Sequence, residues 1–198
     1  MAHNPAVDAT DTADTLAYEG QMWRVYSGIG DLGQRFDAGH VELQAGGVLK
    51  LSISEEVGAG LADTARGVYG TWSVTMRMSK GGGKPCILLW PDDGKRPEMD
   101  FAEGLRGDAE RQTITATYHP DDNRAHSIHH QHAIDYTRYH TYSVDWTATS
   151  LTYLIDGVAW AVDHVQNARP SHLVIMAVWK PGDTTKASYL QVSGVTRP

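Results

Sequence analysis

Short stretches of alternating apolar and polar residues follow one another along most of the chain, and this period of two is typical of β-strands. In the clearest stretch, residues 68–78, one face carries Trp72, Val74, Met76 and Met78. The stretch 85–90 is apolar on both faces, which predicts a central strand covered on both sides. No stretch combines a helical period with capping residues, so the pattern predicts an all-β protein.

Turn residues separate these strands. The pair Asp156-Gly157 predicts a two-residue hairpin turn between strands 151–155 and 158–162. The run Gly81-Gly82-Gly83 lacks the Lys-Ser/Thr and the helix of a phosphate loop, so we interpret it as a hairpin turn after residue 78. The other predicted strands are 21–26, 40–44, 48–53, 112–119, 139–146, 172–179 and 188–195, and the predicted loops include 28–39 and 120–134.

About a dozen short strands at this spacing predict an antiparallel β-sandwich. We predict one domain over residues 17–198, after a disordered tail of small, polar and acidic residues over 1–16. A chain of 198 residues can bury a core without metals or disulfides, and its single cysteine, Cys86, excludes an internal disulfide. We expect a monomer.

Charge and hydropathy narrow the choice of partners. The formal net charge of −7 argues against nucleic acids and sulfated polymers, because phosphate and sulfate groups call for clustered Lys and Arg. No apolar run approaches the roughly 18 residues that a membrane span needs. The first residues contain neither the basic nor the apolar region of a signal peptide.

Three carboxylates, Glu98, Asp100 and Glu103, lie within six residues of a segment that otherwise reads as a strand. Residues two apart share a face of a strand, which places Glu98 beside Asp100 and turns Glu103 to the opposite face. One extra residue, a β-bulge at Phe101-Ala102, would bring Glu103 back to join the other two. The spacing alone also fits a solvated acidic strand, so the choice between this and a bulged, catalytic strand depends on the neighbouring motifs.

Ordered motifs surround this acidic segment. Upstream lie Tyr69-Gly70 and residues 87–91, Ile-Leu-Leu-Trp-Pro; downstream lie residues 140–147, His-Thr-Tyr-Ser-Val-Asp-Trp-Thr, and 153–157, Tyr-Leu-Ile-Asp-Gly. Over roughly residues 40–180 this set resembles glycoside hydrolase family 16, in the laminarinase-like branch with the bulged E-x-D-x-x-E signature. The lichenase-like branch of that family has one residue fewer. The resemblance implies a jelly-roll of two curved sheets with the carboxylates on the concave face, beneath a sugar-binding cleft.

The resemblance also implies roles for the three carboxylates. Glu98 is the expected nucleophile, and Glu103 the expected general acid and then general base, in cleavage with retention. Asp100, between them, is expected to keep the two Glu side chains in different protonation states. The family further implies a secreted, extracellular protein.

Five other residues are predicted to contact substrate. Sugar rings stack on flat side chains, and Trp90 ends the strand just before the acidic segment. Trp179 ends the penultimate strand, where the resemblance implies a Trp that lines the cleft. His119 and His126 are predicted to border the cleft and to bind sugar hydroxyls. Arg96 stands near the nucleophile, where the family usually has Gly next to the Glu, and is expected to influence which sugar is accepted.

No metal or cofactor is predicted. The run His126, His129, His130 and His132 suggests zinc, but no Cys or nearby acidic residue completes a set of ligands. The last strand, 190–195, lacks the Asp that often binds structural calcium in the family, which argues against that ion.

The leading hypothesis is a retaining endo-β-glycosidase that acts on a neutral polysaccharide, with a β-1,3- or mixed-linkage β-glucan first. A transglycosylase would use the same carboxylates with a sugar as acceptor. A lectin-like carbohydrate-binding jelly-roll would keep the aromatic residues but would not need the pair Glu98 and Glu103.

Overall fold

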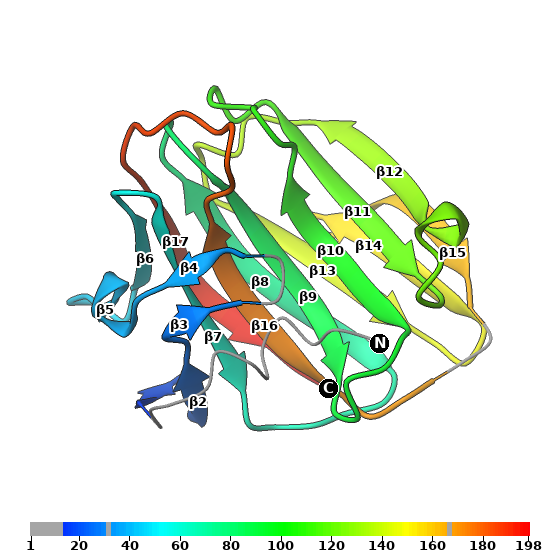
Figure 1. The fold of residues 1–198 in the computed structure, drawn as a ribbon. Helices are drawn as coiled ribbons and strands as arrows, with labels where there is room; N and C mark the ends of the chain where they lie inside the picture. The colour runs from blue at the N-terminus through cyan, green and yellow to red at the C-terminus, as the bar shows by residue number, and fades with distance from the viewer. Residues whose placement is uncertain (1–13, 31–32, 166–167) are drawn as a thin grey trace.

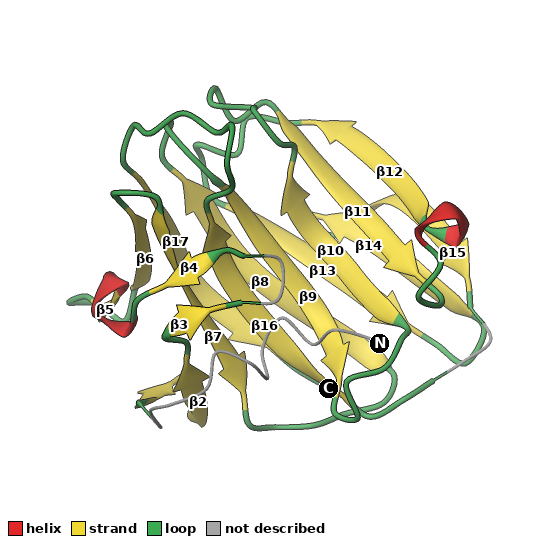
Figure 2. Ribbon diagram, viewed as in Figure 1, coloured by secondary structure: helices red, strands yellow, loops and turns green. Residues whose placement is uncertain are grey.

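A computed structural model describes residues 14–30, 33–165 and 168–198 of the chain. Two stacked sheets form the body of this structure (Figures 1 and 2). The helical segments of the described residues are two short 3₁₀ turns, η1 (Ala38–His40) and η2 (Arg124–His126). The predicted all-β jelly-roll sandwich is therefore confirmed.

The larger sheet has ten strands, ordered β1-β2-β7-β16-β9-β10-β11-β12, with β3 paired to β4 and β4 paired to β7. All of its pairs are antiparallel except β4 with β7. Its strands are β1 (Thr15–Tyr18), β2 (Gln21–Val25), β3 (Gly28–Ile29), β4 (Arg35–Phe36), β7 (Val57–Asp63), β9 (Lys84–Pro91), β10 (Glu98–Gly104), β11 (Thr113–His119), β12 (Ile128–Ala133) and β16 (Ser171–Val178).

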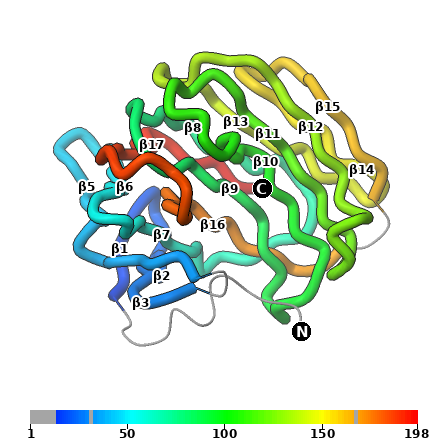
Figure 3. The backbone as a smooth tube through the Cα atoms, turned by 45° about the horizontal axis from the view of Figure 1, so that its top comes forward, coloured from blue at the N-terminus to red at the C-terminus, as the bar shows by residue number. Residues whose placement is uncertain are grey.

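The smaller sheet has seven antiparallel strands in the order β15-β14-β13-β8-β17-β6-β5. They are β5 (Val41–Leu43), β6 (Leu49–Ile53), β8 (Gly70–Met78), β13 (His140–Trp146), β14 (Ser150–Ile155), β15 (Val158–His164) and β17 (Ser188–Thr196). The predicted hairpin of β14 and β15 is confirmed, and both Asp156 and Gly157 have the positive φ that its tight turn requires. Figure 3 shows the two layers from a second direction, with β12 and β15 at the same end of the sandwich.

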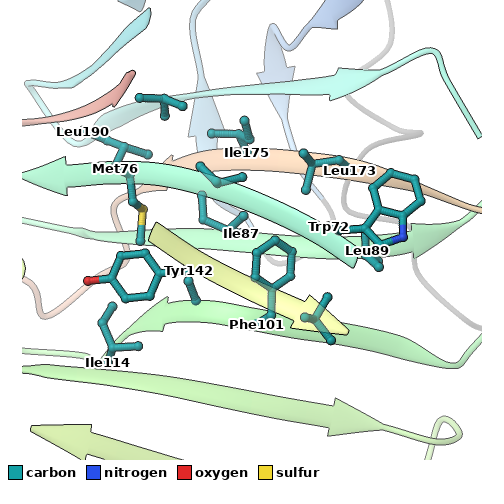
Figure 4. Packing of buried hydrophobic residues seen from close by; sticks show 14 of the residues in the cluster. Trp72, Met76, Ile87, Leu89, Phe101, Ile114, Tyr142, Leu173, Ile175 and Leu190 are labelled. Carbon is teal, nitrogen blue, oxygen red and sulfur yellow. The ribbon is translucent and has the colours of Figure 1, made fainter. Parts of the chain in front are cut away.

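The main core lies between the two sheets. Trp72 and Met76 of β8 pack against residues of the larger sheet such as Ile87, Leu89 and Phe101, and each of these side chains is at most 1% exposed (Figure 4). The apolar face predicted for residues 68–78 is thus the buried one. A second apolar cluster, which includes Tyr26, Phe36, Leu88, Trp90 and Met176, covers part of the outer face of the larger sheet.

Strand β7 was not predicted, because Gly58 and Gly60 interrupt its apolar pattern. Packing explains these glycines: a Cβ on Gly58 would lie 2.2 Å from the carbonyl oxygen of Ala177, on the neighbouring β16. The stretch 120–134 was predicted as a loop, but it contains β12, an edge strand whose mostly polar residues gave no strand signal.

The Gly81–Gly83 run is not the hairpin turn that we predicted. It leads from β8, in the smaller sheet, to β9, in the larger one, and therefore crosses between the two layers. Glycine is required because a Cβ on Gly82 would lie 2.2 Å from the carbonyl oxygen of Thr184. Local sequence does not distinguish a hairpin from a crossing of this kind.

The predicted tail, residues 1–16, falls mostly outside the described residues, which begin at residue 14. Its last two residues, Thr15 and Leu16, belong instead to β1, which pairs with β2. Tyr18 anchors this strand to the body of the protein: its ring is 4% exposed and its hydroxyl donates to the Val192 carbonyl oxygen at 3.2 Å.

Candidate active site

Strand β10 contains the bulge that the resemblance to the family implies for the acidic residues. Across the ladder to β11, Asp100 pairs with Thr117 and Glu103 with Thr115, so three steps on β10 match two on β11. A register shift also interrupts the ladder to β9, between Asp100 and Ala102. Phe101 and Ala102 are consecutive, yet both face the core and are at most 1% exposed. The extra residue therefore leaves Glu103 on the same face as Asp100.

This face of β10 forms one wall of a cleft of about 510 Å³ on the outer side of the larger sheet. Glu98, Asp100 and Glu103 all line the cleft, together with residues of β9, β11, β12 and β16. Glu98 and Asp100 are largely buried, with 8% and 4% of their surface exposed. Carboxylates this buried need charged or hydrogen-bonding partners, and these partners define the electrostatics of the site.

Two of the three carboxylates are paired with cations. The Arg96 guanidinium forms an ion pair with Glu98, and the Lys84 ammonium lies 2.5 Å from Glu103 Oε1. Burial works against the charge of Lys84, but the nearby acidic groups, with Glu103 first among them, together outweigh it, so the pKa of Lys84 lies above its ordinary value. Burial holds the pKa of Arg96 below its ordinary value, against the attraction of Asp100.

The third carboxylate, Asp100, contacts a histidine. Its Oδ2 lies 3.3 Å from His119 Nε2, and the other ring nitrogen of His119 lies 2.6 Å from Ser127 Oγ. The second oxygen of Asp100 is buried and has no partner among the described residues. Asp100 therefore retains a free acceptor between the two Glu residues.

Apolar side chains form the floor of the cleft. Cys86, Leu88, Met176 and Val178 line it from the central strands β9 and β16. Burial, with Glu103 and Asp100 nearby, raises the pKa of the Cys86 thiol well above its ordinary value. Cys86 is therefore a neutral thiol packed under the carboxylates, not an activated nucleophile.

Two of the five predicted substrate contacts line the cleft: Arg96 and His119. Trp90 does not, although it lies on the cleft side of β9. Its side chain is fully buried, and the guanidinium carbon of Arg96 lies 5.4 Å from its ring centroid. A strand-end position does not reveal what covers the side chain.

Trp179 and His126 also lie outside the cleft lining. Along β16 and beyond it, Val178 and Lys180 point to the cleft, so alternation turns Trp179 to the opposite side, where it packs against the core. His126 is exposed and pairs with Asp121 Oδ2 at 2.8 Å. The substrate contacts predicted for these two residues therefore stay predictions.

The histidine run divides between two faces of β12. His129 lines the cleft, and its Nδ1 lies 3.1 Å from Thr117 Oγ1. His130 Nε2 lies 2.8 Å from Asp163 on β15, and His132 packs against Trp160. No group of three or more potential metal ligands occurs in the described part of the chain.

Sequence reasoning missed four cations that line the cleft: Lys84, Arg106, Arg124 and Lys180. Alternation could have found two of them, because Lys84 is two residues before Cys86 and Lys180 two after Val178. Arg106 and Arg124 lie outside the strands, and nothing in the local sequence marks them.

Paired carboxylates on one wall of an open cleft are the groups with which glycoside hydrolases cleave glycosidic bonds. The family model described as "Glycosyl hydrolases family 16" matches residues 31–192. The chain belongs to this family. No curated protein sequence matches it.

Solved structures share its fold. The catalytic domain of an endo-1,3-beta-glucanase (laminarinase) from Thermotoga petrophila RKU-1 is 16% identical, with a TM-score of 0.74 and 92% of each chain covered. The beta-glucanase of Bacillus licheniformis is 17% identical, with a TM-score of 0.71, 95% of this chain covered and 100% of the other. LamAcat from Zobellia galactanivorans is 17% identical, with a TM-score of 0.74 and coverages of 87% and 89%. Within the described residues, no helix has the length and apolarity to cross a membrane.

Proposed function

We propose that this protein is a retaining endo-β-glycosidase that cleaves a polysaccharide by double displacement. Glu98 attacks the anomeric carbon and forms a glycosyl ester while Glu103 donates its proton to the leaving oxygen. Glu103 then takes a proton from water, whose oxygen displaces Glu98. The observation that carries this proposal is the bulge in β10, which turns Glu98, Asp100 and Glu103 to the same cleft.

Retention requires the two carboxyl groups to lie about 5–5.5 Å apart. The partners of Glu98 and Glu103 on β11 are His119 and Thr115, four residues apart, which corresponds to roughly 13 Å along a strand. The two side chains must therefore lean toward each other over Asp100. Glu suits both positions better than Asp because its side chain is one methylene longer.

Asp100 and His119 form the polar link between the two Glu residues. In the proposed reaction, a negative charge on Asp100 disfavours a second charge beside it, which helps one of the two Glu residues to hold a proton. His119 fixes the Asp100 carboxylate through its Nε2 and is itself held by Ser127. We assign both as positioning residues.

For the polysaccharide backbone, a β-1,3- or mixed-linkage glucan is the first substrate to test. Support comes from family membership and from the names of similar structures, which describe a laminarinase and β-glucanases. An open cleft of this kind is also suited to internal cleavage of a long chain.

Two variants with azide test the mechanism. For Glu98→Ala with an activated aryl β-glycoside, we expect azide to restore turnover and to yield the α-glycosyl azide, because azide enters where Glu98 attacked. For Glu103→Ala, azide should yield the β-glycosyl azide, because it replaces water on the glycosyl-enzyme. Glu42→Gln is the matched control: Glu42 is exposed and pairs with Lys50, so wild-type turnover is expected.

Full activity of Glu98→Ala without azide would refute the nucleophile assignment. NMR of the first wild-type product should show the β-anomer, and an α-anomer would refute retention. Polymer binding without cleavage by a folded wild-type protein would favour a lectin-like module. Products longer than the substrate would favour a transglycosylase.

A further inference from the structure

The charge of the cleft is opposite to that of the protein. Five cationic side chains line it against three carboxylates, whereas the whole chain carries 17 Lys and Arg against 24 Asp and Glu. The lining therefore has a formal excess of two positive charges on a protein with a net charge of −7. An excess of one sign of charge in a cleft favours ligands of the opposite sign.

These cations lie near both ends of the catalytic strand. Arg96 precedes β10 and Arg124 lies in η2, beyond the end of β11 whose last residue, His119, pairs with Glu98. Lys84, Arg106 and Lys180 lie at the other end, near Glu103. Arg106 donates to the carbonyl oxygen of Pro181, next to Lys180, and so joins the β10 end to the β16 end. Cations thus stand on both sides of the proposed cleavage point.

The cleft lacks the usual surface for a neutral sugar. No Trp, Tyr or Phe lines it among the described residues, although the chain contains 6 Trp and 9 Tyr. At Trp90, the guanidinium of Arg96 covers the ring on the cleft side. A position that could stack a sugar ring therefore presents a positive charge instead.

From this arrangement we propose that the natural substrate is an acidic polysaccharide, whose sulfate or carboxylate groups bind the cations of the cleft. Arg124 and Lys180 are assigned as specificity residues. The inference rests on the proposed function, because it names the substrate class of the same site. It replaces the neutral polysaccharide expected from sequence, since overall net charge does not describe the charge of a cleft.

Lys84 and Arg96 are expected to affect turnover as well as substrate binding. Each is paired with one of the two proposed catalytic carboxylates, Glu103 and Glu98. An acid group on the sugar offers each cation a new partner and releases the carboxylate oxygen for the reaction. A neutral sugar cannot make this exchange, so substrate charge affects turnover as well as binding. Asp122 could compete with the substrate for Arg96, but its side chain is 62% exposed and its Oδ1 lies 3.9 Å from Arg96 Nε, so this ion pair is weak.

The test compares polymers that share a backbone and differ only in charge. Laminarin, lichenan and agarose are each assayed as the neutral polymer, as a lightly sulfated ester and after oxidation of free C6 hydroxyls to carboxylates. For at least one backbone we expect kcat/KM on an acidic form to exceed that on its neutral parent by about tenfold or more. The sulfate and carboxylate arms identify which acid group is preferred. Added salt should reduce the acidic rates and leave the neutral rates unchanged.

Charge-removing variants identify the residues. Arg124→Gln and Lys180→Gln should each lower kcat/KM on the preferred acidic polymer by about tenfold, with weaker salt dependence. The matched control is Lys80→Gln: Lys80 pairs with Glu110 outside the cleft, and its variant should behave as wild type.

The outcomes separate the inference from the proposed function. Equal or faster cleavage of every neutral parent would overturn the acidic substrate while leaving the glycosidase intact. If no polymer is cleaved, affinity electrophoresis decides: retardation by acidic forms alone supports the inference and counts against the proposed function. Retardation by neutral forms, or by none, overturns the inference.

Discussion

The fully buried charge of Arg111 allows a stability prediction that needs no substrate. Its side chain is fully buried, and its five N–H groups donate at 2.6–3.1 Å to the backbone carbonyl oxygens of Ser79, Gly81, Gly82, Gly83 and Asp108. It thereby holds the connection between the two sheets that ends at Lys84. The predicted perturbation is Arg111→Met, which keeps the length of the side chain and removes every donor.

The magnitude follows from the number of bonds. Five hydrogen bonds at about 1 kcal/mol each give a loss of about 5 kcal/mol. Removing a buried charge returns part of its desolvation cost, and water reaches some of the freed carbonyls, which reduces the expected loss to about 3 kcal/mol. At 2–4 °C per kcal/mol for a chain of this size, the melting temperature should fall by roughly 6–12 °C.

Differential scanning calorimetry of Arg111→Met and wild type at pH 7 measures this shift. Arg111→Lys should lie between the two, because the ammonium keeps the charge and three donors. The matched control is Arg138→Met: Arg138 is 81% exposed, so a change of at most about 0.5 kcal/mol is expected. A fall of less than about 2 °C for Arg111→Met would refute the reasoning, because the five bonds would then contribute almost nothing.

Three further predictions concern the bulge, pH and the link between the sheets. Deletion of Ala102 should restore regular alternation in β10 and leave Glu103 facing the cleft. We expect the free energy of unfolding to fall by about 1–2 kcal/mol, because a buried side chain is lost, and the activity to stay within tenfold of wild type. A folded but inactive variant would contradict this expectation. Burial lowers the pKa of His172 despite its hydrogen bond to Asp92, so the unfolded chain binds a proton more readily than the folded one. The free energy of unfolding should therefore fall as pH drops below about 6.5, by at most about 1.4 kcal/mol per pH unit. In urea titrations between pH 5 and 7, His172→Gln should show a smaller change of this free energy with pH, and an unchanged pH dependence would exclude this cause. Asp163 is buried and accepts hydrogen bonds from His130 at 2.8 Å and from Tyr153 at 3.0 Å. Asp163→Ala should therefore lower the free energy of unfolding, measured in urea, by about 2–4 kcal/mol. A loss below about 0.5 kcal/mol would show that water replaces the carboxylate.

Sequence alone determined the features that depend on local geometry. The alternation over 68–78 predicted a buried face because side chains on a strand alternate between two sides, whatever its partners. The offset between Asp100 and Glu103 required one extra residue if both were to share a face, and the bulge has that residue. Apolarity on both faces predicted that 85–90 is central, and β9 lies between β16 and β10.

Tertiary structure decided everything that depends on which segments meet. Whether Gly81–Gly83 turns back or crosses between layers depends on the partners of β8 and β9, which lie far away in sequence. Strand β7 depends on the close approach of β16, for which Gly58 is needed.

The tertiary structure also decided which side chains and charges line the cleft. Trp90 is on the expected side of β9, but Arg96 covers it, and no local pattern records that contact. The cations of the cleft come from separate strands and loops, so neither net charge nor any single motif predicts their meeting. Once the bulge is present, covalent geometry along one strand places the three carboxylates on one face. The surrounding charge is instead set by contacts between residues up to 96 positions apart, from Lys84 to Lys180.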